Sequence, residues 1–376
     1  MGDHVKRTVN GHRRRPTNED RATFFTPPTA RDRCTFGPVA PCDPQDYASA
    51  NPVFQSGGLH VSDVNSVLGS VDPSALGFTL CHEHVVVGSA GIQQTYPELF
   101  DRAAVIEEGV RRLTEARAEG VQTIIDLTPM ELGRDIRLLE EVSQRSGVQI
   151  IAATGTYVDI PRYMWFAEPD RWTDVYVREV EEGIEGTGIK AGVIKTANNE
   201  AAPEPKEVSV IRGVARAHLR TGVPISTHTH PQERSGEYQV RILQEEGVDM
   251  SRVCIGHSND TTDLDYLRRL LQSGVYLGMD TYPWHGSPPT WEERTATAKA
   301  LIDEGYAGQM MFSHDWSIKR DPDDSWGSNA EAHQARNPDG YLFITRRVLP
   351  RLREMGVSDD TINEIMVENP RRFFER

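Results

Sequence analysis

The segment GFTLCHEHVVV (77–87) combines an apolar run with two histidines, and it gives the clearest indication of the fold. Its length and its branched apolar residues are typical of a strand that is buried on both faces of a parallel sheet. His82 and His84 are two residues apart, so on a strand both side chains point to one face, whereas Glu83 points to the opposite face. The segment therefore predicts a buried strand that presents two imidazoles on the same side.

Similar apolar runs recur along the rest of the chain. They are VQTIIDL (121–127), VQIIAATG (148–155), AGVIKTA (191–197), VPISTHTH (223–230), SRVCIGHS (251–258), GVYLGMDTY (274–282) and QMMFSHDW (309–316). Amphipathic helical stretches such as 101–120 and 206–222 separate most of them and end in glycine, as helices with a glycine cap do. Eight strands that alternate with helices predict an α/β fold, namely a closed (β/α)8 TIM barrel. No GxGxxG motif follows the first run, which disfavours an open nucleotide-binding sheet.

Composition argues against several classes of protein. The 376 residues include 41 Lys+Arg and 56 Asp+Glu, and a net charge of −15 repels nucleic-acid phosphates. No apolar stretch is long enough to predict a membrane span. Twelve histidines and only four cysteines favour histidine chemistry over a disulfide scaffold. Cys81 and Cys254 lie inside apolar runs, and we expect them to be reduced core residues of a cytoplasmic protein.

The first 60 residues differ from the remainder of the chain. They contain prolines and a basic cluster at 13–15 but almost no apolar periodicity, which favours a disordered extension. An export signal is the alternative, but the segment PTNEDRATFF after the arginines is not an apolar signal core. We therefore predict an extension over residues 1–60 and a single barrel domain over residues 61–376.

Polar residues lie near the ends of several apolar runs, where a barrel of this type forms its active-site face. Four further candidates each belong to a different run: Lys195, His228, His257 and Asp315. The histidine pair belongs to the first run. Any one of them alone could be a core histidine, a helix cap or a lysine that reaches a surface carboxylate. Together, several imidazoles and a carboxylate suit zinc, manganese, iron or cobalt. A protonated lysine would be repelled by such a cation, so Lys195 fits only if it is neutral or converted into an anion.

These ordered motifs resemble the phosphotriesterase family of the amidohydrolase superfamily, from about residue 64 to the end of the chain. The resemblance is carried by GFTLCHEH, ATGTYVDIP, AGVIKTA, THTH, IGHSND, FSHDW and NPRRFF. It implies two divalent metal ions, most simply zinc, at the carboxyl ends of the strands. The implied ligands are His82, His84 and Asp315 for the more buried ion, His228 and His257 for the more exposed ion, and carboxylated Lys195 as a bridge together with a hydroxide.

The resemblance also implies catalytic roles. The bridging hydroxide would be the nucleophile, and Asp315 would take its proton. Asp260 matches a proton-relay carboxylate of the family, and Tyr157 stands where the lactonase branch has tyrosine and the organophosphate branch tryptophan. Thr281 departs from both branches, which have arginine or histidine there, and this weakens the transfer of the relay. The segments around Trp284 and over 317–340 differ as well, and the sequence indicates no target for them.

Three functions remain open on this basis. The first is a metal-dependent hydrolase that opens lactones or cleaves related esters, with weak promiscuous hydrolysis of organophosphate triesters. The second is a phosphotriesterase or an N-acyl amide hydrolase, and the third is a non-catalytic metal-binding barrel. For the hydrolases the partner is a small-molecule lactone, ester or organophosphate substrate, and a homodimer is expected by analogy with the family.

Overall fold

A ring of parallel strands forms the centre of the computed structural model, which describes residues 63–283, 288–320 and 334–375. The strands are β3 (Thr79–Val87), β4 (Thr123–Asp126), β5 (Gln149–Gly155), β6 (Val193–Ala197), β7 (Ile225–His228), β8 (Val253–Ile255), β9 (Tyr276–Met279), β10 (Met310–Phe312) and β11 (Ser317–Arg320). From β3 to β10, each strand pairs in parallel with the next one along the chain. Each of the eight predicted apolar runs contains one of these strands.

The segment 310–320, which contains β10 and β11, closes the ring. β10 pairs with β9, and β11 then pairs in parallel with β3, the first strand, so that Ser317 lies opposite His84. Between the two strands, Asp315 N donates to His82 O at 3.0 Å, and His82 N donates to Ser313 Oγ at 3.0 Å. The last strand segment is thus bonded to the first, and the predicted (β/α)8 TIM barrel is confirmed.

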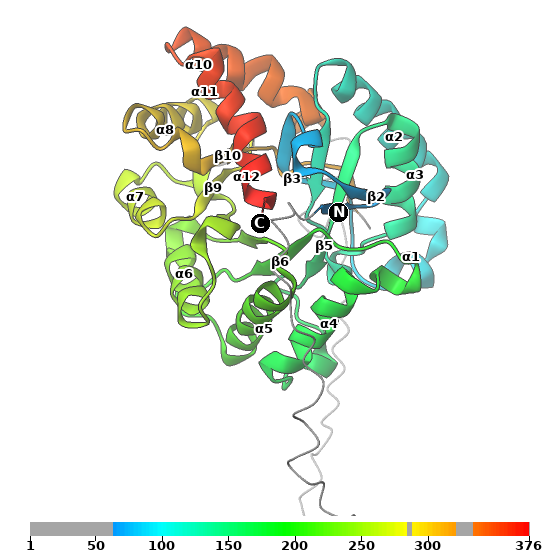
Figure 1. Cartoon of the computed structure of the whole chain (residues 1–376). Coiled ribbons are helices and arrows are strands. Elements are labelled where there is room, and N and C mark those ends of the chain that lie inside the picture. Colours follow the sequence, from blue (N-terminus) through cyan, green and yellow to red (C-terminus); the bar gives the residue numbers. More distant parts are fainter. Residues whose placement is uncertain (1–62, 284–287, 321–333, 376) are drawn as a thin grey trace, which may run out of the picture. The chain divides into compact units, whose positions relative to one another are not determined.

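Helices flank the strands, and most of them lie around the outside of the ring (Figure 1). They are α1 (Ile92–Thr95), α2 (Arg102–Ala118), α3 (Ile136–Ser146), α4 (Pro169–Glu181), α5 (Pro205–Thr221), α6 (Ser235–Glu245), α7 (Leu264–Gln272), α8 (Trp291–Asp303), α10 (Leu349–Glu354), α11 (Asp359–Asn363) and α12 (Asn369–Phe374). Local sequence sets their ends: Asp101 caps the start of α2, and Gly222 ends α5 with a left-handed φ of 69°. An antiparallel pair, β1 (Val64–Ser66) and β2 (Gly69–Val71), precedes the barrel and was not expected from the sequence.

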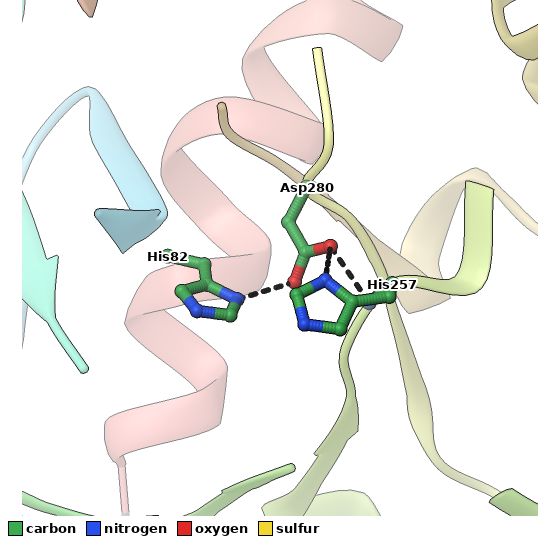
Figure 2. A group of neighbouring side chains, drawn as sticks. All are labelled: His82, His257 and Asp280. Atoms are coloured by element: carbon green, nitrogen blue, oxygen red, sulfur yellow. Dashed lines mark hydrogen bonds and ion pairs between the residues drawn. The ribbon is translucent and has the colours of Figure 1, made fainter. Parts of the chain in front are cut away.

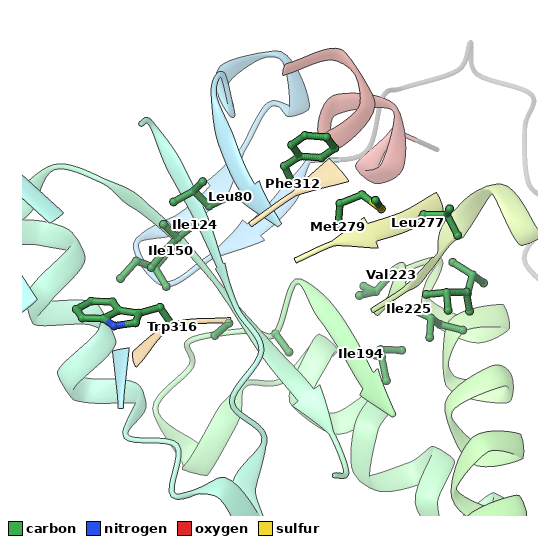
Figure 3. Close-up of a cluster of buried hydrophobic side chains, with 14 of the residues drawn as sticks. Leu80, Ile124, Ile150, Ile194, Val223, Ile225, Leu277, Met279, Phe312 and Trp316 are labelled. Carbon is green, nitrogen blue, oxygen red and sulfur yellow. The ribbon is translucent and has the colours of Figure 1, made fainter. Parts of the chain in front are cut away.

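Alternate residues of the strands belong to two apolar clusters. The larger cluster includes Leu80, Ile124, Ile150 and Ile194 and packs the strands against the helices (Figure 3). The smaller cluster, inside the ring, includes Cys81, Ile125, Ile151, Val193, Cys254 and Met311, together with Phe373 and Phe374 of α12. Cys81 and Cys254 are buried free thiols, as predicted. Because Phe373 packs edge to face on Tyr276 at the start of β9, α12 covers the amino ends of the strands and leaves the carboxyl ends for the site.

Glu83 is a charged residue buried at the junction of the first and last strands, with 0% exposure. Its carboxylate accepts hydrogen bonds from Ser313 Oγ at 2.6 Å, His314 N at 3.0 Å and Trp316 N at 3.1 Å. The His314 imidazole donates through Nδ1 at 2.6 Å, because its Nε2 accepts from Ile344 N at 3.0 Å. One side chain therefore ties β3 to the segment that carries Asp315.

Several expectations concern residues outside the described ranges. The predicted extension over residues 1–60, the side chains of Trp284 and His285, and residues 321–333 of the long loop all lie there. Within the described ranges, none of the helices combines the length and apolar character that a membrane crossing requires.

Removing the Glu83 carboxylate should destabilise the barrel at its closure. Glu83→Ala leaves several buried donors without an acceptor, and each costs about 1–3 kcal/mol, so we expect a loss of at least about 3 kcal/mol in the free energy of unfolding. Glu83→Gln keeps the volume and one acceptor oxygen and should lose less. Chemical denaturation measures both values. Glu107→Gln, which breaks an exposed ion pair with Arg145, is the control and should leave the free energy of unfolding unchanged. If Glu83→Ala also left it unchanged, the role of Glu83 in closing the barrel would be contradicted.

Candidate metal centre

All six residues expected as metal ligands lie at the carboxyl ends of the strands. They are His82 and His84 on β3, Lys195 on β6, His228 at the end of β7, His257 after β8 and Asp315 after β10. Asp315 Oδ1 is 3.0 Å from His84 Nε2 and 3.5 Å from His82 Nε2. Lys195 Nζ is 3.3 Å from the same His82 nitrogen. The barrel thus brings residues from the first, fourth and eighth strands into contact.

The two remaining histidines form the other part of the cluster. His257 Nε2 lies 2.6 Å from His228 Nδ1, and the His257 ring stacks on His82 with centroids 5.0 Å apart. His257 and Asp315 have left-handed φ values of 59° and 50°. Such backbone conformations cost on the order of 1–3 kcal/mol for residues other than glycine and are concentrated at functional sites. The chain adopts them here at two of the predicted ligands.

Asp280, directly after β9, connects the two parts of the cluster (Figure 2). Its Oδ2 is 2.7 Å from His82 Nδ1, and its Oδ1 is 3.1 Å from His257 Nδ1 and accepts from His257 N at 2.7 Å. Carboxylates that bind one ring nitrogen of a histidine fix the orientation of the ring and leave the other nitrogen for a metal. Asp280 therefore orients one histidine from each part of the cluster.

The other two imidazoles have outer partners of their own. His84 Nδ1 is 2.7 Å from Thr128 Oγ1, and His228 Nε2 is 2.8 Å from Asn199 Oδ1. An amide oxygen accepts only, so His228 carries its proton on Nε2 and presents the lone pair of Nδ1 to the centre. Each of the four histidines thus uses one nitrogen on an outer group and turns the other inward.

This donor set fits divalent metal ions. The inward His257 Nε2 and His228 Nδ1 are 2.6 Å apart, so without metal a proton on His257 joins them, and a metal ion would take the place of that proton. The inward nitrogens of His82 and His84 and a carboxylate oxygen of Asp315 lie within 4.8 Å of one another, close enough to share one ion. His82, His257 and Asp280 also form a compact group, but Asp280 meets the outer nitrogens of both rings and is therefore a holder of ligands.

Burial and neighbouring charges keep the cluster in forms that suit a metal. Burial, together with the positive charge of Lys195, lowers the pKa of His82 to about 4. Burial and then the neighbouring His257 lower the pKa of His228 well below its usual value. Burial also lowers the pKa of Lys195 to about 8, against the opposing effect of Asp315. His82 and His228 are therefore neutral near pH 7, and a share of Lys195 is uncharged.

The buried carboxyl group of Asp280 and the partly exposed carboxyl group of Asp315 stay ionised in this environment. Burial by itself would raise the pKa of Asp280, but His257 and His82 outweigh it and hold that pKa below its usual range. The pKa of Asp315 is likewise lowered, by His82 and His84 against burial. In return, Asp280 raises the pKa of His257 although burial of the ring acts in the opposite direction. The anionic carboxylates compensate for the positive charge that the centre would gain with metal.

The predicted catalytic residues Tyr157 and Asp260 lie beside the histidines. The Tyr157 ring packs edge to face on His228, with centroids 4.8 Å apart. Asp260 N donates to His257 O at 3.0 Å, while its carboxylate accepts from Thr281 Oγ1 at 2.6 Å and from Arg294. Sequence reasoning missed Asp280 and Arg294 as members of the site. Asp280 had a usable signal, because it lies near the end of the seventh apolar run as the predicted ligands lie near the ends of theirs.

Comparison with known proteins identifies the family of the chain. The model of the phosphotriesterase family matches residues 62–374. The chain belongs to the phosphotriesterase family. A solved phosphotriesterase from Mycobacterium tuberculosis is 40% identical, with a TM-score of 0.79, and the match covers 84% of this chain and 99% of that one. The phosphotriesterase-family resemblance seen in the motifs is thereby confirmed, and the chain is a hydrolase of this family.

Two curated relatives carry different activity names. An aryldialkylphosphatase of Saccharolobus solfataricus is 35% identical over 309 residues, which are 81% of this chain and 97% of the relative. An N-acetyltaurine hydrolase of Danio rerio is 26% identical over 351 residues, which are 82% of this chain and 97% of the relative. The family therefore includes proteins named for phosphoester and for amide hydrolysis.

Asp280 and Asn199 offer a matched test of the outer partners. Asp280→Asn removes the anion that orients two histidines, and we expect Zn²⁺ affinity to fall about 10–100-fold for every ion bound. Asn199→Ala releases only His228 and should weaken the binding of one ion while sparing the other. Titration of the metal-free protein with Zn²⁺ against a chelator measures both effects. Asp249→Asn, at a cap near the amino end of β8, is the control; full Zn²⁺ affinity in Asp280→Asn would refute the orienting role.

Proposed function

We propose that this protein is a binuclear metal-dependent hydrolase that opens lactones or cleaves related esters. The observation that carries the proposal is the set of four inward-turned imidazoles, each held by an outer partner, around a carboxylate and a buried lysine. We assign His82, His84 and Asp315 to one ion and His228 and His257 to the other. Zinc suits these ligands best, and manganese, cobalt and iron are the alternatives. When bound, such ions supply a Lewis acid and lower the pKa of coordinated water.

Lys195 supports two ions when it is carboxylated. The side chain is 1% exposed and lies against His82, where an ammonium group would oppose the binding of a cation. Reaction of an amine with carbon dioxide requires the neutral form, and a pKa of about 8 makes that form accessible near neutral pH. The product is an anionic oxygen ligand in place of a repelling cation. We therefore assign carboxylated Lys195 as the bridge.

The remaining chemistry is assigned to side chains of this chain. We assign Asp315 as the acceptor of the proton that the attacking water loses, since its carboxylate lies among the inward nitrogens and is ionised. Tyr157, beside His228, can donate a hydrogen bond to a substrate oxygen. Asp260 remains a candidate for the proton relay, although its carboxylate already accepts from Thr281 and Arg294.

The substrate class follows from the groups available to the leaving group. A proton relay to the leaving group would need a basic side chain at position 281, but Thr281 offers only a hydroxyl. The Asp260 carboxylate already accepts a hydrogen bond from that hydroxyl. Both features favour substrates whose leaving group needs little protonation. A lactone meets this condition because its ring oxygen stays tethered after opening. The second candidate, hydrolysis of organophosphates or N-acyl amides, is favoured by the names of the two curated relatives. A metal-binding barrel without turnover is the third candidate.

We also infer that the protein acts in the cytoplasm as a homodimer. The free thiols of Cys81 and Cys254 support a reducing compartment. Large apolar side chains after β5 support self-association, since Phe166 is 94% exposed and Tyr163 is 79% exposed.

Loss of Lys195 tests the binuclear assignment. Lys195→Ala removes the bridge, so we expect fewer than two metal ions per chain, measured by elemental analysis, and the loss of nearly all activity. A short-chain carboxylic acid or bicarbonate should restore part of it. Lys195→Arg should not, because a guanidinium neither ligates nor becomes carboxylated. An active Lys195→Ala protein with two bound ions would rule out the bridge.

A substrate panel tests the proposed class and separates the three candidates. We expect kcat/KM for lactones or aryl esters to exceed that for paraoxon-like triesters and N-acyl amino acids. Tyr157→Phe should lower lactone turnover more than triester turnover, because only the phenol donates to the substrate. A tenfold preference for triesters, equal to about 1.4 kcal/mol in the transition state, would favour the second candidate. Two bound ions without any turnover would favour the third.

A further inference from the structure

Arg294 is a fully buried arginine in the first turn of α8, with 0% exposure. Burial of a guanidinium carries a large desolvation cost unless its charge and its donors are paired. A cation near the amino end of a helix also opposes the helix dipole. Local helix formation and apolar packing therefore do not account for this residue, and its partners indicate its role.

Those partners lie on two segments beside the metal centre. Arg294 Nη1 donates to the Asp260 carboxylate, to Thr281 Oγ1 and, at 2.9 Å, to Thr281 O. Arg294 Nε donates to Pro289 O at 2.9 Å. Thr281 has no charge of its own, so the cation that faces Asp260 comes from α8. The guanidinium thus joins the loop after β8 to the turn after β9.

The same turn carries Asp280. Asn259 Oδ1 accepts from Asp280 N at 3.0 Å and from Thr281 N at 3.2 Å. The backbone of Asp280 is consequently fixed from one side by Asn259 and, through Thr281, by Arg294 from the other. The Asp280 carboxylate cannot move without breaking these bonds or its own bonds to the histidines.

We propose that Arg294 is a positioning residue of the metal centre. By binding Asp260 and Thr281 it fixes the turn at Asp280, and so maintains the orientation of the two imidazoles that Asp280 holds. The inference rests on the proposed metal centre and is independent of which ester is the substrate.

Zn²⁺ affinity, measured by chelator competition, tests this role. Arg294→Met keeps much of the side-chain length but removes the charge and the donors, and we expect affinity to fall about tenfold. Arg294→Lys should recover part of the loss. The double variant Arg294→Met/Asp280→Asn should bind Zn²⁺ no more weakly than Asp280→Asn alone, because both changes act through one carboxylate. Unchanged affinity in Arg294→Met, or losses that multiply in the double variant, would overturn the proposal.

Two further variants separate positioning from general stability. Arg252→Met removes another buried arginine, whose Nη2 donates to Gly222 O at 3.0 Å near the amino ends of the strands, and should lower thermal stability without changing Zn²⁺ affinity. An equal loss of affinity there would also overturn the proposal. If Arg294→Met does not fold, Thr281→Val removes the hydroxyl link and should weaken Zn²⁺ binding severalfold; unchanged binding counts against the role. If the wild-type protein binds Zn²⁺ but opens no lactone, the proposed function is wrong, whereas the test of Arg294 by Zn²⁺ affinity still applies.

Discussion

The buried carboxylate of Glu83 holds the first and last strand segments together, and the site depends on that closure. An ionised or strongly polar group inside a barrel wall is stable only when its hydrogen bonds are complete. Here the hydroxyl of Ser313, two backbone amides and the His314 imidazole complete them. Asp315 follows His314 directly and takes a left-handed conformation. The same contacts that close the ring therefore place a predicted ligand beside the histidines of β3.

A second layer of polar residues gives the inner residues their chemistry. Asp280, Thr128 and Asn199 each bind the outer nitrogen of an imidazole, which selects the tautomer and aims the other nitrogen inward. Burial then favours neutral imidazoles, while Asp280 remains anionic because two histidines face it. The same few contacts thus determine both the charge and the orientation of the imidazoles.

Strand periodicity explains why so much could be predicted from the sequence. Apolar runs of strand length that alternate with amphipathic helices indicated the barrel, and a two-residue spacing put His82 and His84 on one face. Parallel strands in a ring bring their carboxyl ends together, so the run ends at Lys195, His228, His257 and Asp315 were expected to meet. In the structure Lys195 and Asp315 contact His82, and His257 contacts His228 and stacks on His82.

What the sequence by itself determined was the fold and the family, and it supplied the residues that we propose as metal ligands, because these follow from local periodicity and from motifs short enough to be read along the chain. The tertiary structure alone decided which groups hold those residues. Glu83 finds His314 across 231 positions, and Asp280 finds His82 across 198. Arg294 reaches Asp260 from a helix whose own preferences would exclude a buried cation. Such pairings depend on the packing of distant elements, and a spacing pattern in one segment contains no information about them.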